Sequence, residues 1–186
     1  MGMHTLEDLY VRQLEDLYDA ERQFQEILPR VAREAVSPEL KSVLERHHQH
    51  IEIQMKRLEK IFEKAQKSPV NRNCLGMKSL IQEYEEVMGD DISTIISDWA
   101  LIEAVKKMEH YEIAAYRSIR SYARLLKDGD AVGMLTRTIN EKYQLDDELC
   151  QIADEQAKWM GHIYWASWRS GWGVFIGRPA SSVYVI

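Results

Sequence analysis

Residues 101–126 read LIEAVKKMEHYEIAAYRSIRSYARLL, and this stretch decides the fold. Its apolar residues recur at intervals of three and four, the spacing of one face of an α-helix. That face carries Leu101, Val105, Met108, Ala115, Ile119, Tyr122 and Leu126. The pattern predicts a long amphipathic helix over residues 93–127, with one face buried against other helices.

Three other segments carry the same pattern. The first, over residues 5–35, begins with a Thr5–Asp8 capping box, and it contains Pro29, which predicts a kink rather than a stop because the pattern continues beyond it. The second begins at Pro38, with Ser37 as its cap, and ends near Lys67. The fourth, over residues 131–158, follows a tight turn at 128–130. Their apolar faces carry Tyr10, Leu14, Leu17, Phe24, Leu28 and Val31 in the first helix, Leu40, Leu44, Ile51, Leu58 and Ile61 in the second, and Leu135, Thr138, Leu145, Leu149 and Ile152 in the fourth.

The connections between these helices determine how they are wired. The link between the first two helices is very short, so those helices pack antiparallel. Residues 68–92 form a long connection that contains a short helix on Met77, Leu80, Ile81, Tyr84 and Met88. In ferritin-like bundles, a long crossover connects the second helix to the third. The sequence therefore predicts an all-α, ferritin-like antiparallel four-helix bundle over residues 1–158, with a short helix in its crossover.

Several positions on the inward faces are ionisable rather than apolar. Glu21 is spaced by sevens from Leu14 and Leu28, and Glu112 by sevens from Val105 and Ile119. Carboxylates are seldom buried unpaired, because desolvation costs an ionised group several kcal/mol. A cation is the simplest common partner, and carboxylate with imidazole suits iron, manganese or zinc. The predicted metal ligands are Glu21, His47, His50, Glu109, Glu112 and Glu141.

Each of these residues also has a structural interpretation. A single inward Glu, such as Glu141, is more often salt-bridged or partly exposed than a ligand, and His47 or His50 alone is more often a hydrogen-bonded packing residue. His48 lies off the inward face, and His110 points away from the Glu112 face. The metal hypothesis depends on the coincidence of ionisable residues across four helices.

Four runs of sequence carry a family resemblance: LEDLYDAE at 14–21, SPEL at 37–40, RLEKIF at 57–62 and EHYEIA at 109–114. With these runs the chain resembles the YciE/YciF family of ferritin-like bacterial stress proteins, over residues 5–156. The resemblance implies a ferritin-like bundle in a cytoplasmic bacterial protein linked to stress responses, and it implies a homodimer or larger homo-oligomer.

The candidate ligands depart from the usual ferritin-like pattern, which has a Glu on each of two helices and a Glu-x-x-His pair on each of the other two. The second helix offers His47-x-x-His50, where relatives tend to carry an acid at the position of His50. The fourth offers Glu141-x-x-Gln144, and the third offers Glu109-x-x-Glu112, as some rubrerythrin-like sites do. A single or weak metal site is therefore as compatible with the sequence as a full di-iron centre.

Composition excludes several classes of function. A formal charge of -6 argues against a general nucleic-acid binder, which needs a basic face. No apolar run before the tail has the length of a membrane span, and the start of the chain lacks the pattern of a signal peptide. Cys74 and Cys150 do not make a disulfide framework, which favours a reducing cytoplasm. Gly-rich phosphate loops and His-Glu-x-x-His motifs do not occur in the sequence.

Residues 159–186 differ in character from the bundle, because four of the five tryptophans lie here together with Gly171, Gly173 and Gly177. Exposed aromatic area of this kind usually marks a partner surface, self-association or packing onto the same chain, so a protein partner is one interpretation of this tail. A divergent end without a selected role is the other. Two functions stay open: a metal-binding protein that oxidises ferrous iron or consumes peroxide, and a metal-free stress protein that acts through self-assembly or partner binding.

Overall fold

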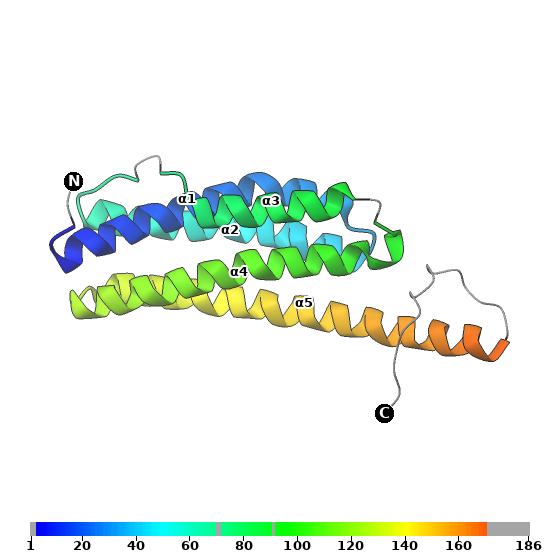
Figure 1. The fold of residues 1–186 in the computed structure, drawn as a ribbon. Coiled ribbons are helices and arrows are strands. Elements are labelled where there is room, and N and C mark those ends of the chain that lie inside the picture. Colours follow the sequence, from blue (N-terminus) through cyan, green and yellow to red (C-terminus); the bar gives the residue numbers. More distant parts are fainter. Residues whose placement is uncertain (1–2, 70–71, 91, 171–186) are drawn as a thin grey trace, which may run out of the picture. The chain divides into compact units, whose positions relative to one another are not determined.

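A computed structural model describes residues 3–69, 72–90 and 92–170, without the side chains of residues 95, 159 and 161–170. The described chain folds into five α-helices, which Figure 1 shows in sequence colours. They are α1 (Leu6–Glu34), α2 (Pro38–Lys64), α3 (Leu75–Gly89), α4 (Thr94–Leu125) and α5 (Gly129–Ser170). The predicted all-α, ferritin-like bundle with a short crossover helix is confirmed.

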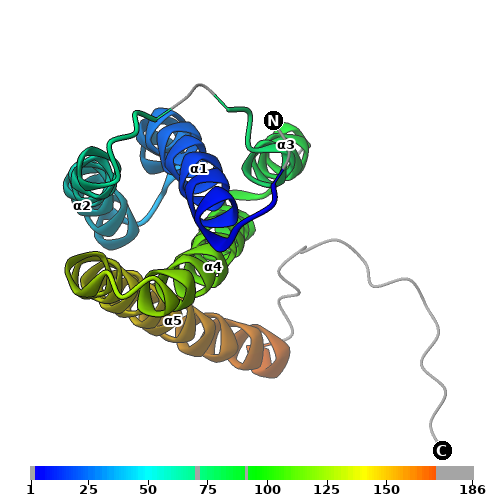
Figure 2. The ribbon, with the colours of Figure 1, turned by 90° about the vertical axis from the view of Figure 1, so that its left-hand side faces the viewer.

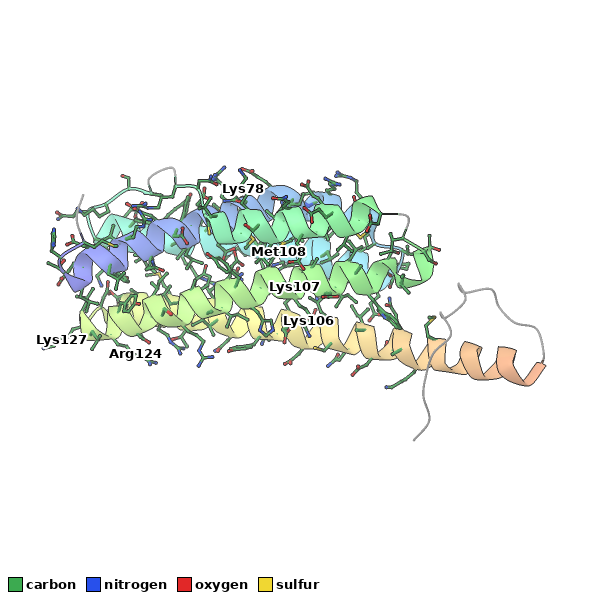
Figure 3. The ribbon with its side chains drawn as sticks, in the orientation of Figure 1. Lys78, Lys106, Lys107, Met108, Arg124 and Lys127 are labelled. Carbon is green, nitrogen blue, oxygen red and sulfur yellow. The ribbon has the colours of Figure 1, made fainter. Side chains whose placement is uncertain are left out.

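Four long helices surround the interior. Seen end-on, α1, α2, α4 and α5 form the bundle, and α3 lies outside it against α1 and α4 (Figure 2). Short turns join α1 to α2 and α4 to α5, so each pair runs antiparallel. Side chains fill the space between the helices, and Met108 of α4 is among the fully buried ones (Figure 3). Most interior positions are apolar, and the completely buried glutamates lie in the middle turns of α1 and α4.

The sequence signals at the helix termini form the expected contacts. The hydroxyl of Thr5 accepts a hydrogen bond from the backbone of Asp8, and the Asp8 carboxylate accepts one in return from the backbone of Thr5, at 3.0 Å each. Ser37 caps α2 through the backbone N–H of Leu40 at 3.3 Å, with Pro38 at the first helical position. Helix α1 continues through Pro29, as the apolar pattern predicts.

Asp98 of α4 holds the turn between α1 and α2. Its two carboxylate oxygens each accept a backbone hydrogen bond at 2.8 Å, one from Val36 and one from Ser37. Asp98 is 5% exposed, so water does not replace these bonds easily. One side chain of the fourth element therefore fixes the first turn of the bundle.

We expect Asp98→Ala to lower the free energy of unfolding by about 2–4 kcal/mol, because two backbone donors lose their acceptor. Urea denaturation followed by circular dichroism measures this loss. Asp130→Ala is the matched control, since the Asp130 side chain is 80% exposed and pairs only with Lys64 at the surface, so its loss should stay within about 0.5 kcal/mol. Equal losses for the two variants would show that Asp98 does not hold the turn.

A second buried carboxylate anchors the crossover that leads to α3. Asp19 of α1 is 2% exposed and accepts a hydrogen bond from the backbone N–H of Cys74 at 2.7 Å. It also pairs with Arg22 on its own helix. The start of α3 is thereby fixed to the middle of α1, which places α3 beside α1 and α4.

The fourth bundle helix ends later than the sequence pattern suggests. Helix α5 was expected to end at residue 158 and instead extends to Ser170. The segment 159–170 contains Gly161 but no proline, so little in it opposes helix propagation. By compactness the chain divides into two units, Met1–Ile152 and Ala153–Ile186. Side chains of the predicted aromatic tail lie largely outside the described residues, and the roles predicted for the tail stay predictions.

Within the described residues, the helices lack the apolar length that crossing a membrane requires.

Candidate cation site

The polar middle of the bundle contains a buried lysine among three buried glutamates. The ammonium nitrogen of Lys142 (α5) lies 2.6 Å from a carboxylate oxygen of Glu112, 3.3 Å from one of Glu21 and 3.5 Å from one of Glu109. All four side chains have an exposed fraction of 0%. We call Glu21, His47, Glu109, Glu112, Tyr116 and Lys142 the buried ionic cluster.

Two further side chains complete the buried ionic cluster. Nε2 of His47 (α2) lies 2.7 Å from the second carboxylate oxygen of Glu109, and the His47 ring packs against Phe24 with ring centres 5.5 Å apart. The Tyr116 hydroxyl donates a hydrogen bond of 2.7 Å to Glu21. Its ring lies 5.7 Å from the Lys142 nitrogen, within the range of a cation–π contact. Every one of the four bundle helices therefore contributes a side chain.

Helical spacing explains why these side chains meet. Lys142 is seven residues from Leu135 and from Leu149, both buried, so it occupies a core position of α5. His47 occupies the corresponding position of α2, three residues after Leu44 and four before Ile51. Because the helices run side by side with these faces inward, core positions at the middle of each helix reach the same region.

Burial and mutual proximity shift the pKa values of the buried ionic cluster. Burial raises the pKa of Glu112 well above its ordinary value, the nearby charge of Glu21 raises it further, and Lys142 only partly opposes this. Burial also acts to raise the pKa of Glu109, but the charges of Lys142 and His47 outweigh it and hold that pKa below its ordinary value. Burial acts to lower the pKa of Lys142, whereas the three carboxylates raise it above its ordinary value. The lysine is thus a charged ammonium, and Glu112 is the carboxyl that most readily keeps a proton.

The cluster leaves some oxygen atoms without partners. Among the described residues, one carboxylate oxygen each of Glu21, Glu109 and Glu112 is buried and makes no hydrogen bond, and neither does Nε2 of His47, although it lies 2.7 Å from the Glu109 oxygen. A buried acceptor without a donor costs about 1–3 kcal/mol. The cluster therefore has more acceptor capacity than its single ammonium and its tyrosine hydroxyl satisfy.

Four of the six predicted site residues meet in the interior, namely Glu21, His47, Glu109 and Glu112. Lys142 was not among the predicted site residues, although its spacing of seven residues from Leu135 and from Leu149 indicates an inward position. His48 is half-buried, and His110 is 56% exposed and lies 3.1 Å from Asp146, which agrees with the predicted outward direction of His110.

The expected positions of Glu141 and His50 are wrong. Glu141 lies on the side of α5 that faces α2, where both its oxygens accept hydrogen bonds from Arg57 at 2.6 and 2.8 Å, and its side chain is 25% exposed. These bonds, with one from Gln54, hold the pKa of Glu141 below its ordinary value although burial opposes them. His50 is exposed. The physical reason is a one-residue offset, because Lys142 rather than Glu141 occupies the inward position.

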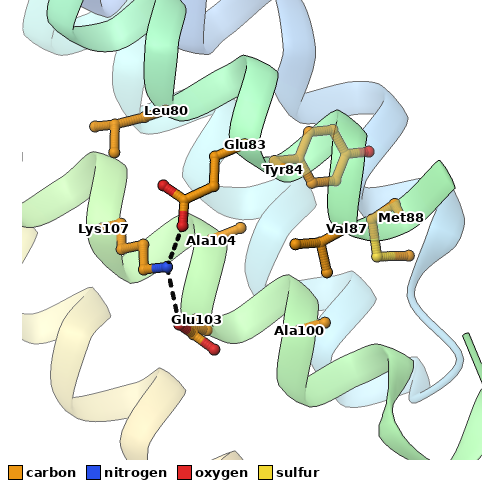
Figure 4. A pocket seen from close by; sticks show the side chains of 9 residues that line it. All are labelled: Leu80, Glu83, Tyr84, Val87, Met88, Ala100, Glu103, Ala104 and Lys107. Carbon is orange, nitrogen blue, oxygen red and sulfur yellow. Dashed lines mark hydrogen bonds and ion pairs between the residues drawn. The ribbon is translucent and has the colours of Figure 1, made fainter. Parts of the chain in front are cut away.

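Two surface grooves lie away from the buried glutamates. One, between α2 and α5, is lined by Val43, Arg46, His47, His50, Glu141, Gln144, Leu145 and Glu148. The other lies between α3 and α4, where Lys107 bridges Glu83 and Glu103 at 2.6 and 2.9 Å beside Leu80, Val87 and Met88 (Figure 4). His47 is the residue common to the first groove and the buried ionic cluster.

Comparison with known proteins places the chain in a family. A family described as a domain of unknown function, DUF892, matches residues 5–159. The chain belongs to the DUF892 family. Protein YciF of Escherichia coli strain K12 is 32% identical over 154 residues, which cover 82% of this chain and 93% of YciF. The family resemblance that the sequence motifs indicate is thereby confirmed.

Solved structures agree with the DUF892 assignment. The crystal structure of the E. coli stress protein YciF matches with a TM-score of 0.81 and 30% identity, and it covers 84% of this chain and 99% of that structure. The structure of YcfI from Rhodopseudomonas palustris matches with a TM-score of 0.77 and 32% identity, and it covers 80% and 94% of the two chains. The bundle architecture of this DUF892 protein is thus shared with both.

The donors at the centre suit a transition metal in kind but not in arrangement. Three carboxylates and one imidazole are acceptable ligands for iron, manganese or zinc. Metal–oxygen distances are about 2.0–2.2 Å, whereas the glutamates surround an ammonium nitrogen at 2.6–3.5 Å. Within the described part of the chain, no three His, Cys, Asp or Glu side chains are grouped so that they could hold a metal ion. With Lys142 in place, these residues do not fit a divalent ion.

Proposed function

We propose that this DUF892 protein is a stress protein that works without a metal cofactor, as a structural bundle that acts through its surfaces. The observation that carries the proposal is the Lys142 ammonium, which lies among Glu21, Glu109 and Glu112 at the centre of the bundle. A ferritin-like bundle places its metal ions among inward carboxylates of this kind. Here a side chain of the protein itself supplies the positive charge.

Electrostatics support this proposal. A divalent ion about 4 Å from the ammonium would be repelled by roughly 8 kcal/mol at an effective dielectric constant of about 20. Lys142 is also tethered to α5, so it competes at a high effective concentration against any ion in solution. The Tyr116 hydroxyl occupies further acceptor capacity on Glu21 through its hydrogen bond, and the His47 ring lies 2.7 Å from Glu109. Iron-dependent oxidation is therefore not the function that this arrangement favours.

The test is the metal content and melting temperature of the purified full chain, with and without Fe(II), Mn(II) and Zn(II). We expect no stoichiometric metal and an unchanged melting temperature. A real site would be detected, since an ion at about 100 times its Kd adds about 2.7 kcal/mol to the free energy of unfolding. One or two ions per chain with a clear rise in melting temperature would overturn the proposal.

A second candidate function is metal binding with oxidation of ferrous iron or consumption of peroxide. The convergence of Glu21, His47, Glu109 and Glu112 supports it, because these are ligand types that iron accepts. It requires Lys142 to leave the interior and the glutamates to close on the ion by about 1 Å. The same measurement on the wild-type chain separates the two candidates.

The surfaces through which a structural stress protein acts belong to the proposal as well. We propose self-association as a homodimer or larger homo-oligomer in the cytoplasm, with the C-terminal tail as a second contact surface for a protein partner. Light scattering on the full chain measures self-association, and the same measurement on a chain that ends at residue 158, before the tail, shows how much of it the tail contributes. A monomer in both cases would remove self-association from the proposal.

A further inference from the structure

The buried glutamates remain a potential metal site that one lysine side chain keeps closed. We infer that Glu21, His47, Glu109 and Glu112 form a latent site for a divalent transition metal, and that Lys142 is the residue which excludes the ion. This inference rests on the proposed function, because it assumes that the wild-type chain binds no metal. Beyond the proposed function, it identifies Lys142 as the residue that excludes the ion and names the ligands that would bind the ion without Lys142.

The carboxylates of the buried ionic cluster have oxygen atoms to which no hydrogen-bond donor is bound. One oxygen each of Glu21, Glu109 and Glu112 is buried without a hydrogen bond among the described residues, although the other oxygen of each contacts Lys142. Three buried carboxylates face one ammonium. A divalent ion would balance more of their charge than the monovalent ammonium does, and it would accept a larger number of oxygen ligands.

The proposed metal ligands are held in place by their helix and by neighbouring side chains. Glu109 and Glu112 are one turn apart on α4, so the same helix aims both at the centre. His47 packs against Phe24 and contacts Glu109, and Glu21 accepts a bond from Tyr116. The Phe24 packing and the Tyr116 hydrogen bond would orient His47 and Glu21 from outside the ligand set, as second partners do at established metal sites.

The Lys142 side chain occupies the space beside the carboxylates. Its side chain is completely buried, and it is the cluster's contribution from α5. Truncation to alanine removes the charge and the volume beside the carboxylates together. Replacement of Lys142 by methionine removes the charge but keeps most of the side-chain volume. The alanine and methionine variants together therefore separate electrostatic from steric exclusion of the metal ion.

The experiment measures Co(II) binding by visible absorption, which reports the number and type of ligands, together with the melting temperature. Lys142→Ala should bind one Co(II) per chain, with a spectrum of oxygen and nitrogen ligation and a rise in melting temperature. Lys142→Met should bind at least tenfold more weakly, and wild type should show neither signal. Lys142→Ala/Glu109→Gln should lose the site, because Glu109 contacts both His47 and the cluster centre.

Folding of the variants is verified by circular dichroism. Should Lys142→Ala not fold, Lys142→Ala/Glu112→Gln carries fewer buried charges and keeps three donors, so it replaces the single variant in the same titration. Folded variants without Co(II) binding would overturn the inference but leave the proposed function intact. Equal binding by wild type and Lys142→Ala would overturn both, and binding that survives Glu109→Gln would place the ion elsewhere and overturn the inference.

Discussion

Lys142→Met lowers the free energy of unfolding by about 3–5 kcal/mol at pH 7, the expected loss when one partner of a buried ion pair is removed. The methionine side chain keeps the volume of the core, so the loss comes from charge. Glu21, Glu109 and Glu112 remain buried without their common cation. For a chain of this size, the melting temperature should fall by roughly 6–20 °C.

The pH dependence of this loss identifies its cause. Without the ammonium, the buried carboxyls bind protons more tightly in the folded than in the unfolded chain, so the variant gains stability as the pH falls toward about 5. The difference from wild type should shrink over the same range. Lys106→Met is the matched control, because Lys106 (labelled in Figure 3) is 30% exposed where α4 faces α5, and its ion pair with Asp146 is worth at most about 1 kcal/mol. A loss for Lys142→Met as small as for this control would contradict a charged role for Lys142.

The fold could be predicted from the sequence because its signals are local and repeated. Apolar residues at steps of three and four identify four long helices, and the Thr5 and Ser37 caps mark where two of them begin. The end of α5 could not be placed in the same way. Its predicted end at residue 158 depended on a change in composition, and composition alone does not stop a helix that lacks proline.

A residue of the candidate site could be predicted from the sequence when it met two conditions. It had to be ionisable at a helical position that is otherwise apolar, and it had to be a residue type that binds metal ions. Glu21, Glu112 and His47 satisfy both conditions, and the structure brings them together. Lys142 breaks the series in the same way, between Leu135 and Leu149, but lysine is almost never fully buried unless it is paired. The three carboxyl groups that justify its burial come from two other helices, α1 and α4, so the reason for its position is tertiary. Glu141 was expected to face inward because it lies between Thr138 and Leu145, which are both buried, but its neighbour Lys142 occupies the inward position.

Glu109 and Glu112 lie one turn apart on α4, yet their replacement by glutamine should have opposite effects. Glu109 contacts the Lys142 ammonium at 3.5 Å and the His47 ring at 2.7 Å, and these charges hold its pKa below the ordinary value. A carboxyl with a lowered folded-state pKa contributes stability at pH values above its unfolded pKa, and this contribution is lost as the pH falls. Glu109→Gln should therefore lower the free energy of unfolding by about 2–4 kcal/mol at pH 7.

Glu112 has the reverse linkage, because burial and the charge of Glu21 raise its pKa well above the ordinary value. The folded chain keeps a proton that the unfolded chain releases, so wild type loses stability as the pH rises above about 4.5, by up to about 1.4 kcal/mol per pH unit. Glu112→Gln removes this loss, so the variant should match wild type near pH 4.5 and exceed it at pH 8. Urea denaturation of both variants at pH 4.5, 7 and 8 measures the free energy of unfolding. Glu141→Gln is the control, because Glu141 lies outside the buried ionic cluster in a partly exposed ion pair with Arg57. Similar losses for Glu109→Gln and Glu112→Gln at every pH would show that the two carboxyls share the Lys142 charge equally, and that neither keeps the proton assigned to Glu112.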